Sequence, residues 1–476
     1  MSGLLASIFT DLNLPNPATW LYFSGLLSVA LFFKFGRLVS LRNLDLLALF
    51  LFGPGLLLLA ESHARHRQAH DAALFLFGGG FLLPADGGRD ALGYGCLLLA
   101  CLYFLARSLL DLGLVRRPAL SSNMELPGLA WLAGALFVSL AFVTLSHPAR
   151  PAYEGPAPSA LNIPGLVDRA LPEVSLRVVE RVLSLLCHLS VAVGLAMVGW
   201  RVFENAQAGM SAATLYLLLP YVFLLAPESP SGAGRWDHSW PMALFVWSVF
   251  CYRTPLLAGA FLGLSMGTAW YMVVTLPAWL SFYGQRGAVR FLAGFVTAGA
   301  VAVGLLGFLW WLNGELPEAL RSGWMTFDWQ PWRKPPERSV GFWQSVPGWV
   351  AAYRLPVFFA AASVPVLSLF WPRPKDLAHV LALSSASLIS IQFWHADRGG
   401  VYVLWFLPLL LLMVFRPNLS ERRAPELPPD GWPVRLARWA LGVAKWTIRL
   451  ALPADRPGPR PTPQPPAGKG APPPSV

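Results

Sequence analysis

The sequence predicts an all-α polytopic membrane protein whose apolar helices form a transmembrane helical bundle. Of its 476 residues, 55% are hydrophobic and only 13% are charged, whereas a globular chain carries roughly 25% charged residues. Many windows reach the roughly 20 mostly apolar residues that one helical crossing needs, and these runs are continuous rather than alternating. Because backbone polar groups in lipid must be satisfied within each segment, we expect helices, about 11–13 spans in residues 1–416.

The basic residues set the expected orientation. The net charge of +11 would by itself be compatible with nucleic-acid binding, but Lys and Arg concentrate in short loops and near the C-terminus, as in the cytoplasmic loops of membrane proteins. We therefore predict no nucleic acid partner. We expect a multi-pass protein of the cell inner (plasma) membrane, embedded in the lipid bilayer, with its N-terminus outside and its C-terminus cytoplasmic. The expected inner clusters are Lys34/Arg37/Arg42, Arg116/Arg117, Arg286/Arg290 and Arg373/Lys375.

The first half of the chain supplies spans that alternate in direction. Residues 72–84 are apolar but short, and they contain three consecutive glycines. We interpret them as re-entrant or interfacial, because counting them as a span would place Arg116 and Arg117 outside. The expected spans are residues 20–36, 44–60, 91–110, 128–145, 182–200 and 211–225.

The second half begins with short crossings that are interrupted by prolines and by a run of small residues from Ala258 to Gly263. A basic turn from Gln285 to Arg290 should reverse the chain before a longer outward helix. The expected crossings are 239–252, 255–270, 272–283, 289–312, 349–371, 376–393 and 399–416, and the expected outer loops are 61–90, 147–180, 227–238 and 313–348.

The first outer loop contains two carboxylates that are candidates for catalysis. Glu61 lies where an apolar helix meets the outer interface, and Asp71 ends the same polar stretch. An acid at such an interface is costly to hold in lipid and is often functional, with an interfacial cap as the alternative. Three histidines between them are possible metal ligands, but two neighbouring arginines would repel a cation. We predict no metal site and favour a solvated, titratable loop.

The loop before residue 239 carries Arg235, Asp237 and His238 beside an expected helix start. These side chains are candidates for lining a polar substrate pocket above the bundle. The alternative for Asp237 is an N-cap, in which its carboxylate accepts backbone N–H bonds from the first helical turn.

Two further outer segments contribute candidate binding residues. In the long tryptophan-rich loop we select Trp329 and Arg333, because aromatic faces beside cationic donors suit sugar rings and phosphates. An interfacial tryptophan belt is the alternative explanation. The tight turn with His395, Asp397 and Arg398 could bind an anionic headgroup, or its side chains could satisfy one another.

The order of prolines, polar loops and small-residue runs in the central region has a counterpart in a known superfamily. A helix ending in Pro220-Tyr221 leads through a polar loop to a helix start at Asp237-His-Ser-Trp-Pro241. The segment from Tyr252 to Gly263 is rich in small residues, and Leu276-Pro277 then precedes the basic turn at Arg286. This succession resembles GT-C-type membrane glycosyltransferases, and most nearly the polyprenyl-phosphate-mannose-dependent mannosyltransferase-like group.

The resemblance implies transfer of a sugar from a polyprenyl-phosphate donor to an acceptor on the outer face. In that superfamily the catalytic acid lies in the first large outer loop, after an outward-going helix, and acts as general base on the acceptor hydroxyl. The matching positions here are Glu61 and Asp71. Beyond the lipid-linked sugar, the resemblance implies no cofactor.

Two other functions compete with this hypothesis. A transporter or flippase-like bundle should show charges at mid-depth in the membrane. His188 and His379 are the only ionisable residues that we place within or near the predicted spans, and neither has an acidic partner in sequence, which disfavours transport. A non-catalytic membrane protein is the other alternative.

The composition changes after Arg416. Residues 417–452 form a cytosolic segment in which tryptophans and aliphatic residues recur every three or four positions beside basic residues. This pattern predicts an amphipathic helix lying in the headgroup region, and packing against another cytosolic helix is the alternative. Residues 453–476 are dominated by Pro and Gly, so we expect a disordered tail.

Overall fold

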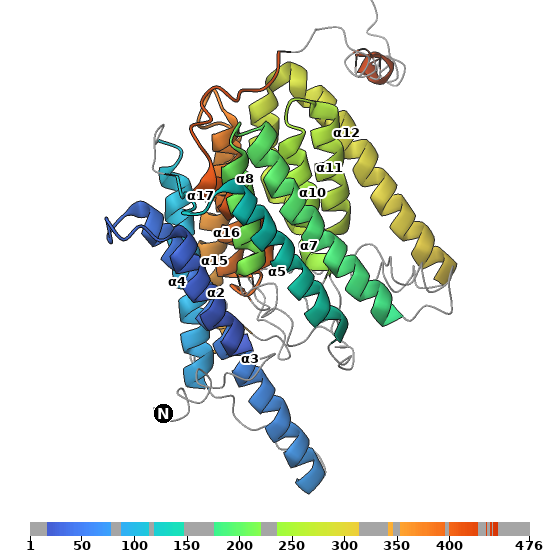
Figure 1. The fold of residues 1–476 in the computed structure, drawn as a ribbon. Helices are drawn as coiled ribbons and strands as arrows, with labels where there is room; N and C mark the ends of the chain where they lie inside the picture. The colour runs from blue at the N-terminus through green and yellow to red at the C-terminus, as the bar shows by residue number, and fades with distance from the viewer. Residues whose placement is uncertain are drawn as a thin grey trace, which may run out of the picture. The chain divides into compact units, whose positions relative to one another are not determined.

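The chain divides into two compact units in the computed structural model, Met1–Leu427 and Pro428–Val476. Helices account for the regular structure of the described residues, where the single β contact is an isolated bridge between Asp376 and Arg423 (Figure 1). The predicted all-α fold is therefore confirmed. The structure describes residues 17–77, 87–113, 119–146, 176–219, 236–313, 341–345, 353–395 and 399–426, with 435, 438–439 and 441–445 of the second unit.

Six helices in the described part of the chain are long and apolar enough to cross a membrane. This finding supports a multi-pass membrane protein, and the predicted count of about 11–13 spans includes shorter segments in addition. The six lie in α3 (Leu41–Phe77), α4 (Gly87–Leu110), α5 (Leu126–Ser146), α7 (Leu176–Arg201), α12 (Leu276–Asn313) and α16 (Leu377–Trp394). Shorter apolar helices lie in α2 (Pro17–Phe32), α11 (Pro255–Thr268) and α15 (Arg354–Ser368).

The core of the first unit is built around two short helices, α8 (Ala206–Leu218) and α17 (Leu407–Phe415). Every residue of α17 is buried, as expected of a helix that is apolar on all sides. It packs against α8, α16 and α10 (Trp236–Phe250), and the 3₁₀ turn η3 (Val403–Trp405) leads into it. The remaining elements are the 3₁₀ helix η1 (Trp270–Thr275) and the one-turn helix α14 (Phe342–Ser345).

The helix α3 continues beyond the point where a loop was expected. It runs without a break from Leu41 to Phe77, so residues 61–77 of the predicted outer loop are helical, and these include the first part, 72–77, of the predicted re-entrant segment. Residues 61–71 contain neither Gly nor Pro and are rich in Ala, Arg and Gln, which have high helix propensity. The loss of hydrophobicity after Ala60 therefore marks a change of surroundings and not the end of the helix.

The small-residue run of α11 allows this helix to touch α12 directly. A Cβ added at Gly259 would lie 2.0 Å from the Phe291 carbonyl oxygen, and one at Gly263 would lie 2.2 Å from the Phe295 carbonyl oxygen. Only glycine permits this separation, and small residues at such spacing are common where membrane helices pack closely. The run therefore serves helix packing.

The predicted reversal before Arg290 is also present. Gly284 has φ 62° and ψ −165°, which divides α12 into two helical pieces. A positive φ of this kind is accessible to glycine without strain. The predicted crossing at residues 272–283 is only partly α-helical, because η1 occupies its first residues.

One end of the first unit gathers basic side chains, and we call it the basic end. Lys34, after α2, contacts the Asn123 side chain before α5 at 2.5 Å, and Arg416, after α17, contacts Asp111 at 3.1 Å. These contacts join turns far apart in sequence, so the turns share one end, as their charges predict. Further basic residues that make contacts at this end are Arg107, Arg201, Arg253, Arg373, Lys375 and Arg422.

The described residues of the second unit are helical, as the amphipathic pattern predicts. Trp439 and Val443, which are four residues apart, are 66% and 40% exposed. They belong to the predicted apolar stripe, whose contact with a membrane surface stays a prediction. The predicted disordered tail at 453–476 lies outside the described residues.

Candidate functional site

At the opposite end of the first unit, three aromatic rings form a stack. The Trp405 ring of η3 lies between Tyr271 of η1, with centroids 3.7 Å apart and planes inclined by 6°, and Tyr402, with centroids 4.2 Å apart and planes inclined by 13°. Such near-parallel contacts add to the stabilisation that ring burial provides. The three residues come from two distant parts of the chain, and we call this the aromatic end.

Two histidines adjoin the stack. The Trp405 indole N–H donates to Nδ1 of His238 at 2.8 Å, and the His238 ring lies 5.5 Å from that of Tyr402. His395, 4% exposed, contacts Tyr402 edge-to-face at 5.7 Å. Because Nδ1 of His238 accepts a bond, this imidazole is neutral in the observed arrangement and carries its proton on Nε2.

The turn after α16 explains how His395 meets Tyr402. His395 caps α16 with an extended backbone, and its N–H donates to the Ile391 carbonyl. Gly400 then takes φ 96°, and its N–H donates to the side chain of buried Gln392 at 3.0 Å. The positive φ, which favours glycine, lets the chain reverse and return Tyr402 to the histidine.

A buried cation lies beside this turn. Arg354, at the start of α15, is fully buried, and its Nε donates to the Trp394 carbonyl at 3.2 Å. Trp343 of α14 donates its indole N–H to the Phe393 carbonyl at 3.0 Å. Thus one tryptophan of the predicted tryptophan-rich loop packs at the aromatic end, next to a guanidinium of the kind that binds phosphate.

The structure brings together two of the ten predicted site residues, His238 and His395. Glu61 is half-buried on α3, away from the loop position expected for it. Asp71 and Asp237 have helical backbones, while the orientation of their side chains is not described. Asp237 is the second residue of α10, so the helix begins slightly earlier than an N-cap role for it requires. Arg235, Trp329, Arg333, Asp397 and Arg398 lie outside the described residues.

Sequence reasoning missed a buried acid at the start of α4. Asp90 is 5% exposed, and one of its carboxylate oxygens is buried without a hydrogen-bond partner within the described structure. Leu97, two turns further along α4, packs against Gly400 of the turn described above. Asp90 is the last residue of the predicted loop 61–90. This position, next to the start of a span, was the sequence feature that could have identified it.

The basic end holds a second polar cluster, made of opposite charges. Arg107 Nε lies 3.3 Å from Asp45, and the same guanidinium bonds Asp111, which also accepts from Arg416 at 3.1 Å. The Tyr103 hydroxyl donates to Asp45 at 2.7 Å. The four charged residues are at least 96% buried. They link the start of α3, the end of α4 and the end of α17, and we call them the ionic cluster.

These contacts correct the expected inventory of charges within the spans. Asp45, Arg107 and Asp111 are buried ionisable groups that we had not counted. His379 does have an acidic partner, since its Nδ1 lies 2.7 Å from Asp376 in a capping box at the start of α16. An N-cap residue and the residue three positions later meet by helix geometry. His188 lies 2.7 Å from the Tyr216 hydroxyl.

The aromatic end combines stacked aromatic rings, two imidazoles and one buried guanidinium. This combination suits a ring-shaped polar ligand that carries hydroxyl groups and a phosphate. Within the described residues, no group of three or more His, Cys, Asp or Glu side chains is placed to hold a metal ion.

No family model, curated protein or solved structure matches the chain. The GT-C resemblance is therefore carried by the residues quoted for it. The geometry of the aromatic end is an independent observation on which a function can be proposed.

Proposed function

We propose that the protein transfers a sugar from a polyprenyl-phosphate donor to an acceptor hydroxyl at its aromatic end, on the outer face of the inner membrane. The observation that carries the proposal is the meeting of His238 and His395 around Trp405. These residues come from α10, the end of α16 and the turn before α17. Together they place aromatic rings and imidazoles, which suit a sugar ring, at one end of the unit.

The chemistry requires a base and a leaving group. The acceptor oxygen attacks the anomeric carbon of the sugar. The bond between the anomeric carbon and the phosphate oxygen breaks, and the polyprenyl phosphate departs. The proton of the acceptor passes to a carboxylate, which contributes about 10²–10⁴-fold in rate as a general base. Arg354 supplies positive charge near the phosphate. Among the acids of residues 61–90, we favour Asp90, because it is buried at the start of α4, with Glu61 and Asp71 as the positions implied by the resemblance.

The buried charges do not favour transport as an alternative. Asp45 lies in the second turn of α3, while Arg107 and Asp111 lie at the end of α4. A transport pathway places its ionisable groups near mid-depth, whereas the ionic cluster lies at helix ends. Its opposite charges also pair with one another, which leaves no evident site for a passing ion.

The test is sugar transfer by the full chain reconstituted in liposomes, with polyprenyl-phosphate mannose as donor. A carboxamide keeps the shape of the acid but cannot accept the proton. Asp90→Asn should therefore lower the rate by about 10²–10⁴-fold without changing donor binding. Glu61→Gln and Asp71→Asn serve as matched variants. Full activity in all three would exclude a general base among these acids.

The same assay separates the sugar-transfer proposal from its non-catalytic alternative. A protein that binds the donor at the aromatic end but transfers no sugar to any acceptor would be a binding protein. Failure of the donor to bind would remove the proposal altogether. Movement of the intact donor between leaflets without transfer would instead identify a flippase.

A further inference from the structure

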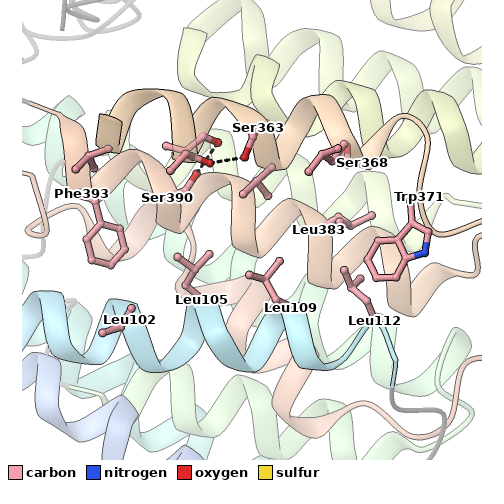
Figure 2. Close-up of a pocket in the computed structure, with 15 residues that line it drawn as sticks. Leu102, Leu105, Leu109, Leu112, Ser363, Ser368, Trp371, Leu383, Ser390 and Phe393 are labelled. Atoms are coloured by element: carbon pink, nitrogen blue, oxygen red, sulfur yellow. Dashed lines mark hydrogen bonds between the residues drawn. The ribbon is translucent and has the colours of Figure 1, made fainter. Parts of the chain in front are cut away.

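A groove runs along the side of the bundle between α4 and the pair α15 and α16. It encloses about 470 Å³, which is within the roughly 300–1,000 Å³ of ligand pockets. Figure 2 shows Leu102 and Phe393 at one end and Leu112 with Trp371 at the other. The groove borders the aromatic end at Phe393 but plays no part in the proposed sugar transfer.

The walls of the groove are apolar. Three serines line it, but their hydroxyls donate to backbone carbonyls: Ser363 to Ala360 at 2.7 Å, Ser368 to Pro365 at 2.7 Å, and Ser390 to Ser387 at 2.8 Å. All other residues that line the groove are Leu, Val, Ala, Phe or Trp. With its hydroxyls engaged in this way, the groove presents apolar surface to an occupant.

The groove matches one leaflet of a bilayer in length. The ten residue steps from Leu102 to Leu112 correspond to about 15 Å at about 1.5 Å per step, which is half of a hydrocarbon core about 30 Å thick. Leu102, Leu109 and Leu367 are 54%, 42% and 59% exposed, so the groove is open on its side. A lipid chain can therefore enter it laterally from the leaflet at the basic end.

Positive charge lies at the basic end of the groove. Trp371 lines the groove and is 58% exposed, and the same turn carries exposed Arg373 and buried Lys375. The nearby Asp376 carboxylate is engaged by the backbone and imidazole of His379. The Lys375 ammonium donates to the Ser281 hydroxyl and the Pro372 carbonyl, so the exposed Arg373 guanidinium is the positive group that a lipid headgroup would meet.

We propose that the groove holds one acyl chain of an anionic glycerophospholipid from the leaflet at the basic end, with its phosphate beside Arg373. Both features are needed for this assignment. The engaged hydroxyls and apolar walls select the chain, while the turn after α15 selects a negative headgroup. The bound lipid would cover the seam between α4 and α15.

The test uses the full chain in nanodiscs that contain phosphatidylglycerol with a photoreactive diazirine in one acyl chain. Cross-linked residues are mapped by mass spectrometry, and phosphatidylcholine with the same chain is the matched probe. We expect phosphatidylglycerol to label groove residues of α4 and α15 well above the lipid-facing side of α5. Ser363→Phe should fill the groove and abolish this excess. Ala360→Phe provides a second filling variant.

Two controls distinguish the groove from general lipid contact. Ser139 on α5 is also exposed and also donates to its own helix backbone, so Ser139→Phe should leave groove labelling unchanged. Arg373→Gln should lower the ratio of phosphatidylglycerol to phosphatidylcholine labelling by about fivefold, the contribution of one basic residue near an anionic leaflet, whereas Arg253→Gln should not. Uniform labelling of α5 and the groove, equal labelling by both probes, or preferential displacement by polyprenyl phosphate would each overturn the proposal.

Discussion

The ionic cluster at the basic end and the aromatic end differ in the side chains that they bury. Asp45 and Asp111 are neutralised by Arg107 and Arg416, and all four are buried. The aromatic end instead holds stacked rings and a neutral imidazole, with Nδ1 of His238 accepting from the Trp405 indole N–H. The first cluster pairs opposite charges and ties three helices together. The second brings uncharged rings together from distant parts of the chain.

This difference predicts different consequences for substitutions at the two ends. Breaking a buried ion pair leaves an uncompensated charge, so it destabilises the fold strongly. Altering a neutral ring at the aromatic end removes a contact to a ligand with less effect on folding. We therefore expect stability and binding to separate between the two ends.

The largest effect on stability should come from Asp111→Asn. This change leaves Arg416 and Arg107 buried without their shared carboxylate, and we expect a loss of about 3–5 kcal/mol in the free energy of unfolding. Denaturation of the purified protein in detergent measures it. The control is Glu204→Gln, because Glu204 pairs with Arg422 while its side chain is 69% exposed, and such pairs contribute about 0–1 kcal/mol. Equal losses in the two variants would show that the ionic cluster does not hold the helices.

A smaller effect is expected for His238→Ala. It removes the acceptor of the Trp405 indole N–H, which is buried in a residue only 4% exposed, and leaving that donor unpaired should cost about 1–3 kcal/mol. His238→Gln offers a carbonyl oxygen as replacement acceptor and should restore most of this stability. Both variants should transfer sugar poorly. Recovery of activity together with stability in His238→Gln would give His238 a purely structural role.

The smallest effect concerns Lys375 and pH. Burial, reinforced by the nearby charge of Arg373, lowers the pKa of Lys375 from 10.5 to about 8. The folded state therefore releases this proton before the unfolded state does, so stability should rise between about pH 8 and about pH 10. We expect about 1–2 kcal/mol, because solvent near the turn screens part of the effect. Lys375→Met should flatten the rise. If stability rose with pH equally steeply in this variant, the rise would belong to another titrating group.

The sequence predicted the fold class well because apolar runs of membrane length have few alternative structures. The reversal near Arg290 and the helix beginning near Asp237 were also found, through glycine and polar residues at helix ends. The end of α3 was placed wrongly at Glu61, because hydropathy reports surroundings while helix propensity determines continuation.

The candidate site was predicted only in part. His238 and His395 stood out as polar residues beside spans, but Tyr271 and Trp405 lay within apolar stretches that looked like ordinary helix. Their stacking depends on which segments meet at one end of the bundle, and no local pattern encodes this. The ionic cluster escaped notice for the same reason, since Asp45 and Arg416 are adjacent only in the folded chain.

The most direct test of the central claim is equilibrium binding of polyprenyl-phosphate mannose to the full chain in nanodiscs, compared between His238→Gln and Asp111→Asn. Affinity is measured on the folded fraction of each variant. The account predicts that His238→Gln weakens binding by about tenfold, equivalent to about 1.4 kcal/mol, while Asp111→Asn leaves the affinity unchanged despite its lower stability. Unchanged affinity in His238→Gln, or a comparable loss in Asp111→Asn, would contradict the assignment of recognition to the aromatic end.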